Sequence, residues 1–301
     1  MSLKPGIYLN TPEKEYRAWP GINYSSLARF NESQDHCLMD WPAKSYFEEG
    51  TAFELLIEDA AKGSLKFDER FFIADAPGVM PEDLAGWIDG KEDLETKYRL
   101  KKDGGLNMQS ARLHAWLDAC RDHPGMMPMG KDQIEMLSKM VDNFMLMQPF
   151  ADQGQEETLA EILPLCDFQV PIIWYVGKMR KKALLDCMFM TDGKIYVFDI
   201  KTSADLKRFA WMLKDKYWIQ EAHYTVGLQS IFPDKEIVWR FLVSSKAEPW
   251  LSQPFCVDPF SMSDNGVQAY YDLCTAYYAW VEDGRPPKGW KELESVKVFF
   301  N

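Results

Sequence analysis

Apolar and polar residues follow two different periods along the chain, and the period changes near residue 160. Before that point, several stretches carry apolar residues three or four positions apart, the spacing of one face of a helix. They are residues 23–30, which open with serines suited to capping, 48–61, and 131–148, which end before Pro149. The first 150 residues are therefore predicted to be mainly helical.

Beyond residue 160 the pattern becomes that of β-strands. Asp192 and Gly193 separate two apolar runs, and an Asp-Gly pair in that position indicates a β-hairpin. Helical spacing returns at 205–232, with a break expected near Lys216, and again at 265–284. The expected strands are residues 168–176, 182–190, 194–202, 236–245 and 250–257.

This order of elements predicts an α/β fold with a mixed central β-sheet flanked by helices and an N-terminal helical layer. With 47% apolar and 14% aromatic residues, the chain can bury a substantial core. We expect one domain over residues 1–301, with the helical layer at 1–150 and the sheet at 151–301. An apolar signal core and a long apolar run are both lacking, so we expect a cytoplasmic protein that does not bind membranes.

The run VFDIKTS at residues 197–203 contains charges within an apolar strand. Asp199 and Lys201 are two positions apart, so they point to the same side. Burying them without partners would cost several kcal/mol. Asp186 lies thirteen residues before Asp199 on the other arm of the expected hairpin, so the three side chains can converge.

Two carboxylates held together repel each other unless a cation lies between them. Carboxylate and carbonyl oxygens suit Mg²⁺ or Mn²⁺, and a nearby lysine can orient water or offset phosphate charge. Alone, an Asp-x-Lys triplet is uninformative, because strand ends often place such a pair in solvent. On the following expected helix, Gln220 and Tyr224 lie four positions apart, hence on one face.

The net charge of −12 opposes nucleic-acid binding, yet basic residues outnumber acidic ones between residues 178 and 216. Within this basic segment, Arg180 and Lys182 could contact a DNA backbone or form a solvated basic face. Thr202 could bind a phosphate or cap the next helix. The tryptophans Trp211 and Trp218 lie at apolar helical positions, so we expect them to pack in the core rather than stack on bases.

Other site classes find little support. The six cysteines and four histidines are scattered without zinc-ribbon, iron–sulfur or HExxH spacing, and there is no phosphate-binding loop.

The motifs D-(x12)-D-I-K-T and Q-E-A-H-Y together resemble the PD-(D/E)xK nuclease superfamily, in the branch with a Q-x-x-x-Y helix. More specifically, the chain resembles the RecE-type catalytic domain of exonuclease VIII and its phage relatives. The resemblance extends to residues 23–40, 48–59, 241–258 and 270–290. Each motif is weak alone, and together they are specific.

The resemblance implies a restriction-endonuclease-like fold and a metal held by Asp186, Asp199 and the Ile200 carbonyl. Lys201 would then assist the attacking water, while Gln220 and Tyr224 would hold the substrate strand. Relatives commonly carry a histidine where this chain has Glu54; a carboxylate can replace it as a metal ligand, or Glu54 can be a surface residue.

The implied activity is Mg²⁺-dependent exonuclease digestion of linear duplex DNA, processive and 5'-to-3', in phage or prophage recombination. The implied partner is a single-strand annealing protein, and a ring-shaped homo-oligomer would gather the basic segments around DNA. Two alternatives remain open: an endonuclease or RecB-like module on the same core, and a DNA-binding or assembly protein that has lost catalysis.

Overall fold

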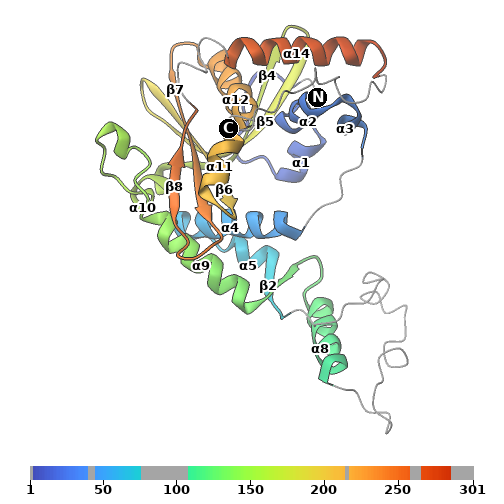
Figure 1. Ribbon diagram of the computed structural model, residues 1–301, viewed down its shortest axis with the longest axis vertical. Helices are drawn as coiled ribbons and strands as arrows, with labels where there is room; N and C mark the ends of the chain where they lie inside the picture. The colour runs from blue at the N-terminus through green and yellow to red at the C-terminus, as the bar shows by residue number, and fades with distance from the viewer. Residues whose placement is uncertain (1–2, 40–44, 76–107, 214–216, 258–265, 286–301) are drawn as a thin grey trace, which may run out of the picture. The chain divides into compact units, whose positions relative to one another are not determined.

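The computed structural model describes residues 3–39, 45–75, 108–213, 217–257 and 266–285 (Figure 1). The chain divides into two compact units, one formed by Met1–Phe47 with Leu146–Asn301 and the other by Glu48–Met145. This division is one of packing, and the single nuclease domain expected over residues 1–301 stays a prediction.

A six-stranded, mostly antiparallel sheet forms the centre of the first unit, in the order β1-β4-β5-β6-β7-β8. Neighbours are antiparallel except β6 and β7, which are parallel and therefore joined by a helical crossover. The five strands expected from the sequence are all present; β1 was missed because it has only two residues. The strands are β1 (Gly6–Ile7), β4 (Asp167–Val176), β5 (Met179–Met190), β6 (Lys194–Ser203), β7 (Glu236–Ser245) and β8 (Ser252–Phe255).

The hairpin between β5 and β6 forms at the predicted Asp-Gly turn. The Thr191 N–H donates to the Lys194 carbonyl at 2.8 Å and closes it. The crossover from β6 to β7 contains α11 (Leu206–Met212) and α12 (Trp218–Ile231). The helix break expected near Lys216 lies outside the described residues.

Helix α12 is apolar on nearly all sides because it is covered on nearly all sides. It lies against β4, β5 and β7, and α2 and α14 pack on it (Figure 1). At Gly227 an added Cβ would lie 2.9 Å from the Trp174 ring, so glycine permits the close approach of helix and sheet. Around it lie α1 (Glu13–Ala18), α2 (Tyr24–Glu32), α3 (Gln34–Leu38) and α14 (Val267–Glu282), with η1 (Ala151–Gln153), α10 (Leu159–Ile162) and η2 (Leu163–Leu165) before β4.

One capping detail differs from expectation. Helix α2 is capped by Asn23, whose side chain accepts from the Ser26 N–H at 3.0 Å, and not by a serine. Asparagine satisfies the free N–H groups of a first turn as well as serine does.

The second unit contains the other predicted helices and a short parallel sheet of β2 and β3 that sequence periodicity did not reveal. Its core includes Phe53 and Phe144, whose ring centroids lie 5.4 Å apart. Across the described residues of the chain, every helix is too short or too polar to cross a bilayer. The elements are α4 (Ser45–Lys62), α5 (Lys66–Arg70), β2 (Phe71–Ile73), α8 (Met108–Asp122), β3 (Met127–Met129) and α9 (Lys131–Met145).

Candidate active site

The candidate site lies where β5 and β6 separate. The two strands are paired only from Cys187 opposite Phe198 to Met190 opposite Ile195. One residue beyond this ladder, the Asp186 side chain takes over from the backbone: its Oδ2 accepts from the Ile200 N–H at 2.8 Å. A backbone donor freed by the separation thus fixes the first carboxylate of the site.

Three oxygens converge on the ammonium of Lys201. Asp199 Oδ2 forms an ion pair with Lys201 Nζ, Asp186 Oδ2 lies 3.9 Å away, and the Ile200 carbonyl oxygen lies 3.4 Å away. The Asp199 side chain is only 2% exposed, whereas those of Asp186 and Lys201 are 16% and 23% exposed. The cluster is therefore buried on one side and reached by solvent on the other.

The charges of the cluster do not balance. Burial raises the pKa of Asp199 to about 7; Lys201 opposes that rise and Asp186 adds to it. Burial also raises the pKa of Asp186, against the pull of Lys201. For Lys201, burial alone would lower the pKa, but Asp199 and Asp186 raise it well above its ordinary range. Two carboxylates share one ammonium, which leaves room for another positive charge.

Helix α12 supplies the next contact. Gln220 is buried, and its Nε2 donates to Asp199 Oδ1. The Tyr224 ring packs edge-on against Trp239, with centroids 5.4 Å apart. Burial raises the pKa of Tyr224, with further contributions from Asp199 and Asp186. The expected helix face is therefore at the site, but Gln220 holds a carboxylate here, and its role on a substrate strand stays a prediction.

Two tyrosines at this site were not anticipated from the sequence. Burial raises the pKa of Tyr24, Tyr217 raises it further, and Lys201 lowers it, so the three groups lie in one electrostatic neighbourhood. Tyr24 begins α2 and Tyr217 precedes α12. The sequence carries no signal for either role, because only the packing of α2 beside α12 brings them to β6.

Lys182 does not face solvent, contrary to one of the two readings considered for it. Its Nζ donates to the carbonyls of Tyr16 at 3.2 Å, Arg17 at 3.2 Å and Trp19 at 2.7 Å. Those carbonyls lie at the C-terminal end of helix α1, where the Tyr16 carbonyl also accepts from the Trp19 N–H at 3.0 Å. All three ammonium hydrogens are used, so the expected contact of Lys182 with a DNA backbone is not supported by its position.

Arg180 and Thr202 lie on neighbouring strands, β5 and β6. Arg180 precedes Asp186 by six residues along β5, which is about 20 Å of strand, so it lies away from the carboxylates. Thr202 is half-buried directly after Lys201 and faces Ser244 in the ladder with β7. Its contact with a phosphate stays a prediction.

The two tryptophans differ. Trp211 on α11 is 80% exposed, so the expected core packing is wrong for this residue. The helix turns its buried face, with Phe209, to the sheet and leaves Trp211 on the other side. Trp218 is half-buried against the apolar cluster formed by α2, α12 and α14, as expected.

The oxygens that the structure brings together are of the kind that divalent metals prefer. Asp186 Oδ2, Asp199 Oδ2 and the Ile200 carbonyl are hard oxygen donors, and in this structure the Lys201 ammonium lies among them. The described residues contain no group of three or more His, Cys, Asp or Glu side chains suited to a metal, so water or substrate would complete the shell. Glu54 lies on α4 of the second unit, and its role as a ligand stays a prediction.

Comparisons with known proteins add little to this geometry. A scan of protein-family models and a search of curated proteins each found no match. Among solved structures, one from Eubacterium rectale, named as a candidate exonuclease, aligns at a TM-score of 0.37 with 14% identity, over 87% of this chain and 96% of its own. A Vibrio cholerae protein, whose name states no activity, aligns at 0.23 with 11% identity, over 94% of this chain and 60% of its own. These values are too low to carry an argument about fold or function.

Proposed function

We propose that the protein is a metal-dependent nuclease that hydrolyses phosphodiester bonds of DNA. One observation carries the proposal: three oxygens from β5 and β6 converge on a lysine ammonium in a cluster that is negative overall and open to solvent on one side. Hard oxygen ligands beside a cationic side chain suit Mg²⁺ and an attacked phosphate. The resemblance of D-(x12)-D-I-K-T and Q-E-A-H-Y to PD-(D/E)xK nucleases supports the same chemistry.

In this proposal Asp186, Asp199 and the Ile200 carbonyl hold Mg²⁺ or Mn²⁺, which would polarise the phosphate and lower the pKa of a bound water. The Ile200 N–H keeps Asp186 in place, and Gln220 Nε2 keeps Asp199 in place. Lys201 retains its proton because both carboxylates raise its pKa. It therefore acts as a charged donor that orients water or offsets charge on phosphate oxygens, and not as the base.

The finer parts of the proposal rest on the resemblance. They are 5'-to-3' polarity, processive digestion of linear duplex, a restriction-endonuclease-like fold, a closed homo-oligomer and an annealing partner. Glu54 as a further metal ligand belongs with them.

The test uses end-labelled linear and circular duplex DNA with Mg²⁺ or with EDTA. Wild type should digest the linear form with Mg²⁺ alone, and Asp199→Asn should not. Lys194→Gln is the matched control, since Lys194 is a partly exposed β6 lysine that pairs with Glu236 at 3.1 Å. Cleavage of circles at the same rate would indicate an endonuclease, and absence of cleavage by wild type with either Mg²⁺ or Mn²⁺ would refute the proposal.

A further inference from the structure

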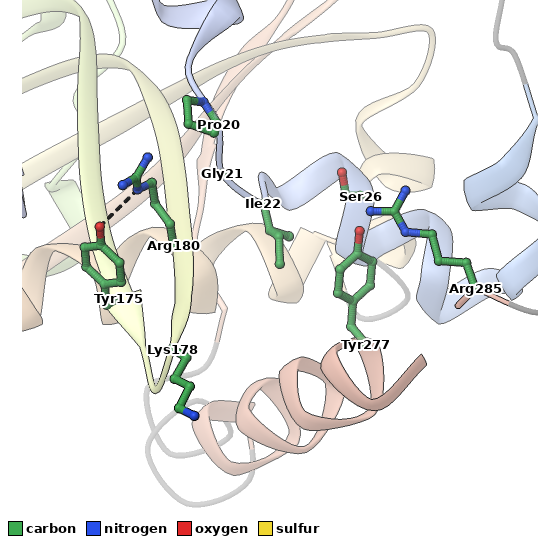
Figure 2. A pocket seen from close by; sticks show the side chains of 9 residues that line it. All are labelled: Pro20, Gly21, Ile22, Ser26, Tyr175, Lys178, Arg180, Tyr277 and Arg285. Atoms are coloured by element: carbon green, nitrogen blue, oxygen red, sulfur yellow. Dashed lines mark hydrogen bonds between the residues drawn. The ribbon is translucent and has the colours of Figure 1, made fainter. Parts of the chain in front are cut away.

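A second hollow lies in the same unit at the tip of the β4–β5 hairpin. Its volume is 480 Å³. Figure 2 shows Tyr175 and Arg180 on the two strands of the hairpin, Lys178 at its turn, and the Tyr277 and Ser26 hydroxyls near Arg285. The lining residues are Pro20, Gly21, Ile22, Ser26, Tyr175, Lys178, Arg180, Tyr277 and Arg285.

The lining of the hollow carries positive side chains and no negative ones. Lys178 and Arg180 come from the β4–β5 hairpin and Arg285 from the segment after α14, and the lining contains no carboxylate. Within the part of the chain that the structure describes, none of the three forms a recorded ion pair. In a protein of net charge −12, three cations around one cavity point to an anionic ligand.

Its walls are preformed. The Ile22 N–H donates to the Arg180 carbonyl at 3.0 Å, and the Lys182 N–H donates to the Ile22 carbonyl at 3.0 Å, so residues 20–22 are tied to β5. Gly21 has a φ of +152°, and an added Cβ would lie 3.3 Å from Lys182 Cγ. This close approach holds the loop against the strand, and the buried Lys182 stem supports it from below.

The cations are oriented by tyrosines. Arg180 Nε donates to the Tyr175 hydroxyl at 3.0 Å, and its guanidinium carbon lies 5.7 Å from the centre of that ring. Tyr175 is still 39% exposed, so part of its ring is free for contact. Burial raises the pKa of Tyr277 and Arg285 lowers it, which fits a guanidinium near that hydroxyl.

Guanidinium groups bind phosphate in a planar, forked geometry, and an exposed tyrosine ring offers a surface on which a base can stack. The volume of 480 Å³ is in the range of small-molecule sites, about 300–1,000 Å³, and so exceeds the needs of an isolated phosphate. An acidic peptide would satisfy the charges but would leave the ring of Tyr175 unused. The chemistry of the walls therefore favours a nucleotide over a peptide.

We propose that this pocket binds a short stretch of a nucleic-acid strand, with successive phosphates at Arg180, Lys178 and Arg285 and a base or sugar against Tyr175. The proposal rests on the proposed nuclease function. Arg180 lies about 20 Å along β5 from Asp186, which corresponds to about six nucleotide steps of a strand at about 3.4 Å each. The pocket would anchor the strand at that distance from the bond to be cleaved.

The test measures binding without chemistry. Fluorescein-labelled single strands of about four and about twelve nucleotides are titrated in EDTA at several salt concentrations, and anisotropy gives Kd. Arg180→Gln and Arg285→Gln should each weaken the longer strand about 5–20-fold and reduce the salt slope by about 0.7, the value for one single-strand phosphate. Tyr175→Phe, which keeps the ring but loses the hydrogen bond to Arg180, should weaken binding less than Tyr175→Ala, which should weaken it about 5-fold or more. The shorter strand, which reaches only one of the two sites at a time, should bind wild type more weakly than the longer strand does.

Lys194→Gln, at the opposite end of the sheet, is the charge-matched control and should bind like wild type. Arg180→Lys is a second variant in case the glutamine variant misfolds, because it keeps the positive charge and loses only the forked guanidinium geometry. Its affinity should lie between those of wild type and Arg180→Gln. Pocket variants that bind the longer strand like wild type would refute the proposal that the pocket binds DNA, without refuting the proposed nuclease function. A labelled poly-glutamate peptide that binds more tightly than DNA, in a manner sensitive to Arg180, would overturn it as well. Wild type that neither binds DNA nor cleaves it would refute both proposals.

Discussion

Lys182 and Lys201 are both charged residues inside strands of one sheet, and their surroundings differ in kind. Lys182 on β5 donates to three neutral carbonyl oxygens at the end of α1. Lys201 on β6 faces two carboxylates and one carbonyl. Burial, and then Arg17, lower the pKa of Lys182, whereas Asp199 and Asp186 raise that of Lys201 despite burial.

The contrast separates structural from chemical use of a buried charge. Lys182 has a complete set of acceptors, so it stabilises α1 against the sheet and has no donor left to offer. Around Lys201 the negative charge exceeds the positive, and part of the site is open to solvent. A charge inside a strand therefore indicates function only when its partners leave the local charge unbalanced.

The largest effect should come from breaking the unbalanced cluster. Lys201→Met should lower the rate of DNA cleavage at least about 100–1,000-fold, because a preorganised charged donor beside the phosphate is lost. Asp199→Asn should do the same through metal binding. Single-turnover cleavage with Mg²⁺ measures the rate, and circular dichroism checks the fold. Activity within about 3-fold of wild type in either variant would remove the site.

Replacement of Lys182 should instead lower stability and leave cleavage almost unchanged. Lys182→Met keeps the aliphatic stem below Gly21 but removes the donor shared by the carbonyls at the end of α1, so the free energy of unfolding should fall by about 2–4 kcal/mol. Urea denaturation measures the loss. Cleavage per folded molecule should stay close to that of wild type, and a large loss of rate at full folding would show that Lys182 serves the chemistry after all.

The sequence was sufficient for the elements whose pattern is local. The hairpin register that placed Asp186 beside Asp199 followed from Asp192-Gly193, and the 3.6-residue period placed Gln220 and Tyr224 on one face. Strand β1 has two residues and pairs with β4 far along the chain, so it leaves no periodic signal.

Roles that depend on distant segments could not be predicted. The acceptors of Lys182 lie 163 to 166 positions earlier in the sequence. The exposed side of α11 was misjudged because Trp211 is apolar and fits a helical period, yet the helix is short and buries only the side that carries Phe209. Polarity patterns say which residues can be buried, and not which ones the neighbouring segments will cover.

A smaller effect is expected in the pH dependence of the free energy of unfolding. His223 is fully buried; its Nε2–H donates to the Lys182 carbonyl at 3.2 Å, so in the neutral ring Nδ1 accepts from the Tyr270 hydroxyl at 2.9 Å. Burial, and then Lys181, lower its pKa from 6.5 to about 3.

The unfolded chain therefore binds a proton at His223 that the folded chain does not, and stability is lost as pH falls below about 6.5 toward 3. Between pH 7 and pH 5 this group should remove about 2 kcal/mol. His223→Gln, which can keep one donor and one acceptor, should flatten that part of the profile in urea titrations. An unchanged slope would mean that other groups control acid stability.

The smallest effect concerns Trp211, which is exposed on the same helix as the exposed side chains of Lys207 and Arg208, shortly after Lys201 in the chain. An aromatic ring beside two cations can stack on a base of the bound strand. Trp211→Ala should leave the free energy of unfolding within about 0.5 kcal/mol, because little area is buried, and should weaken single-strand binding about 5-fold. Anisotropy titrations in EDTA and urea denaturation measure the two quantities. Trp218→Ala is the matched control: it is half-buried against the α2–α12–α14 cluster, so it should destabilise the fold and, in the folded fraction, bind like wild type. A Trp211→Ala variant that loses stability without losing affinity would restore the packing role that the sequence first suggested.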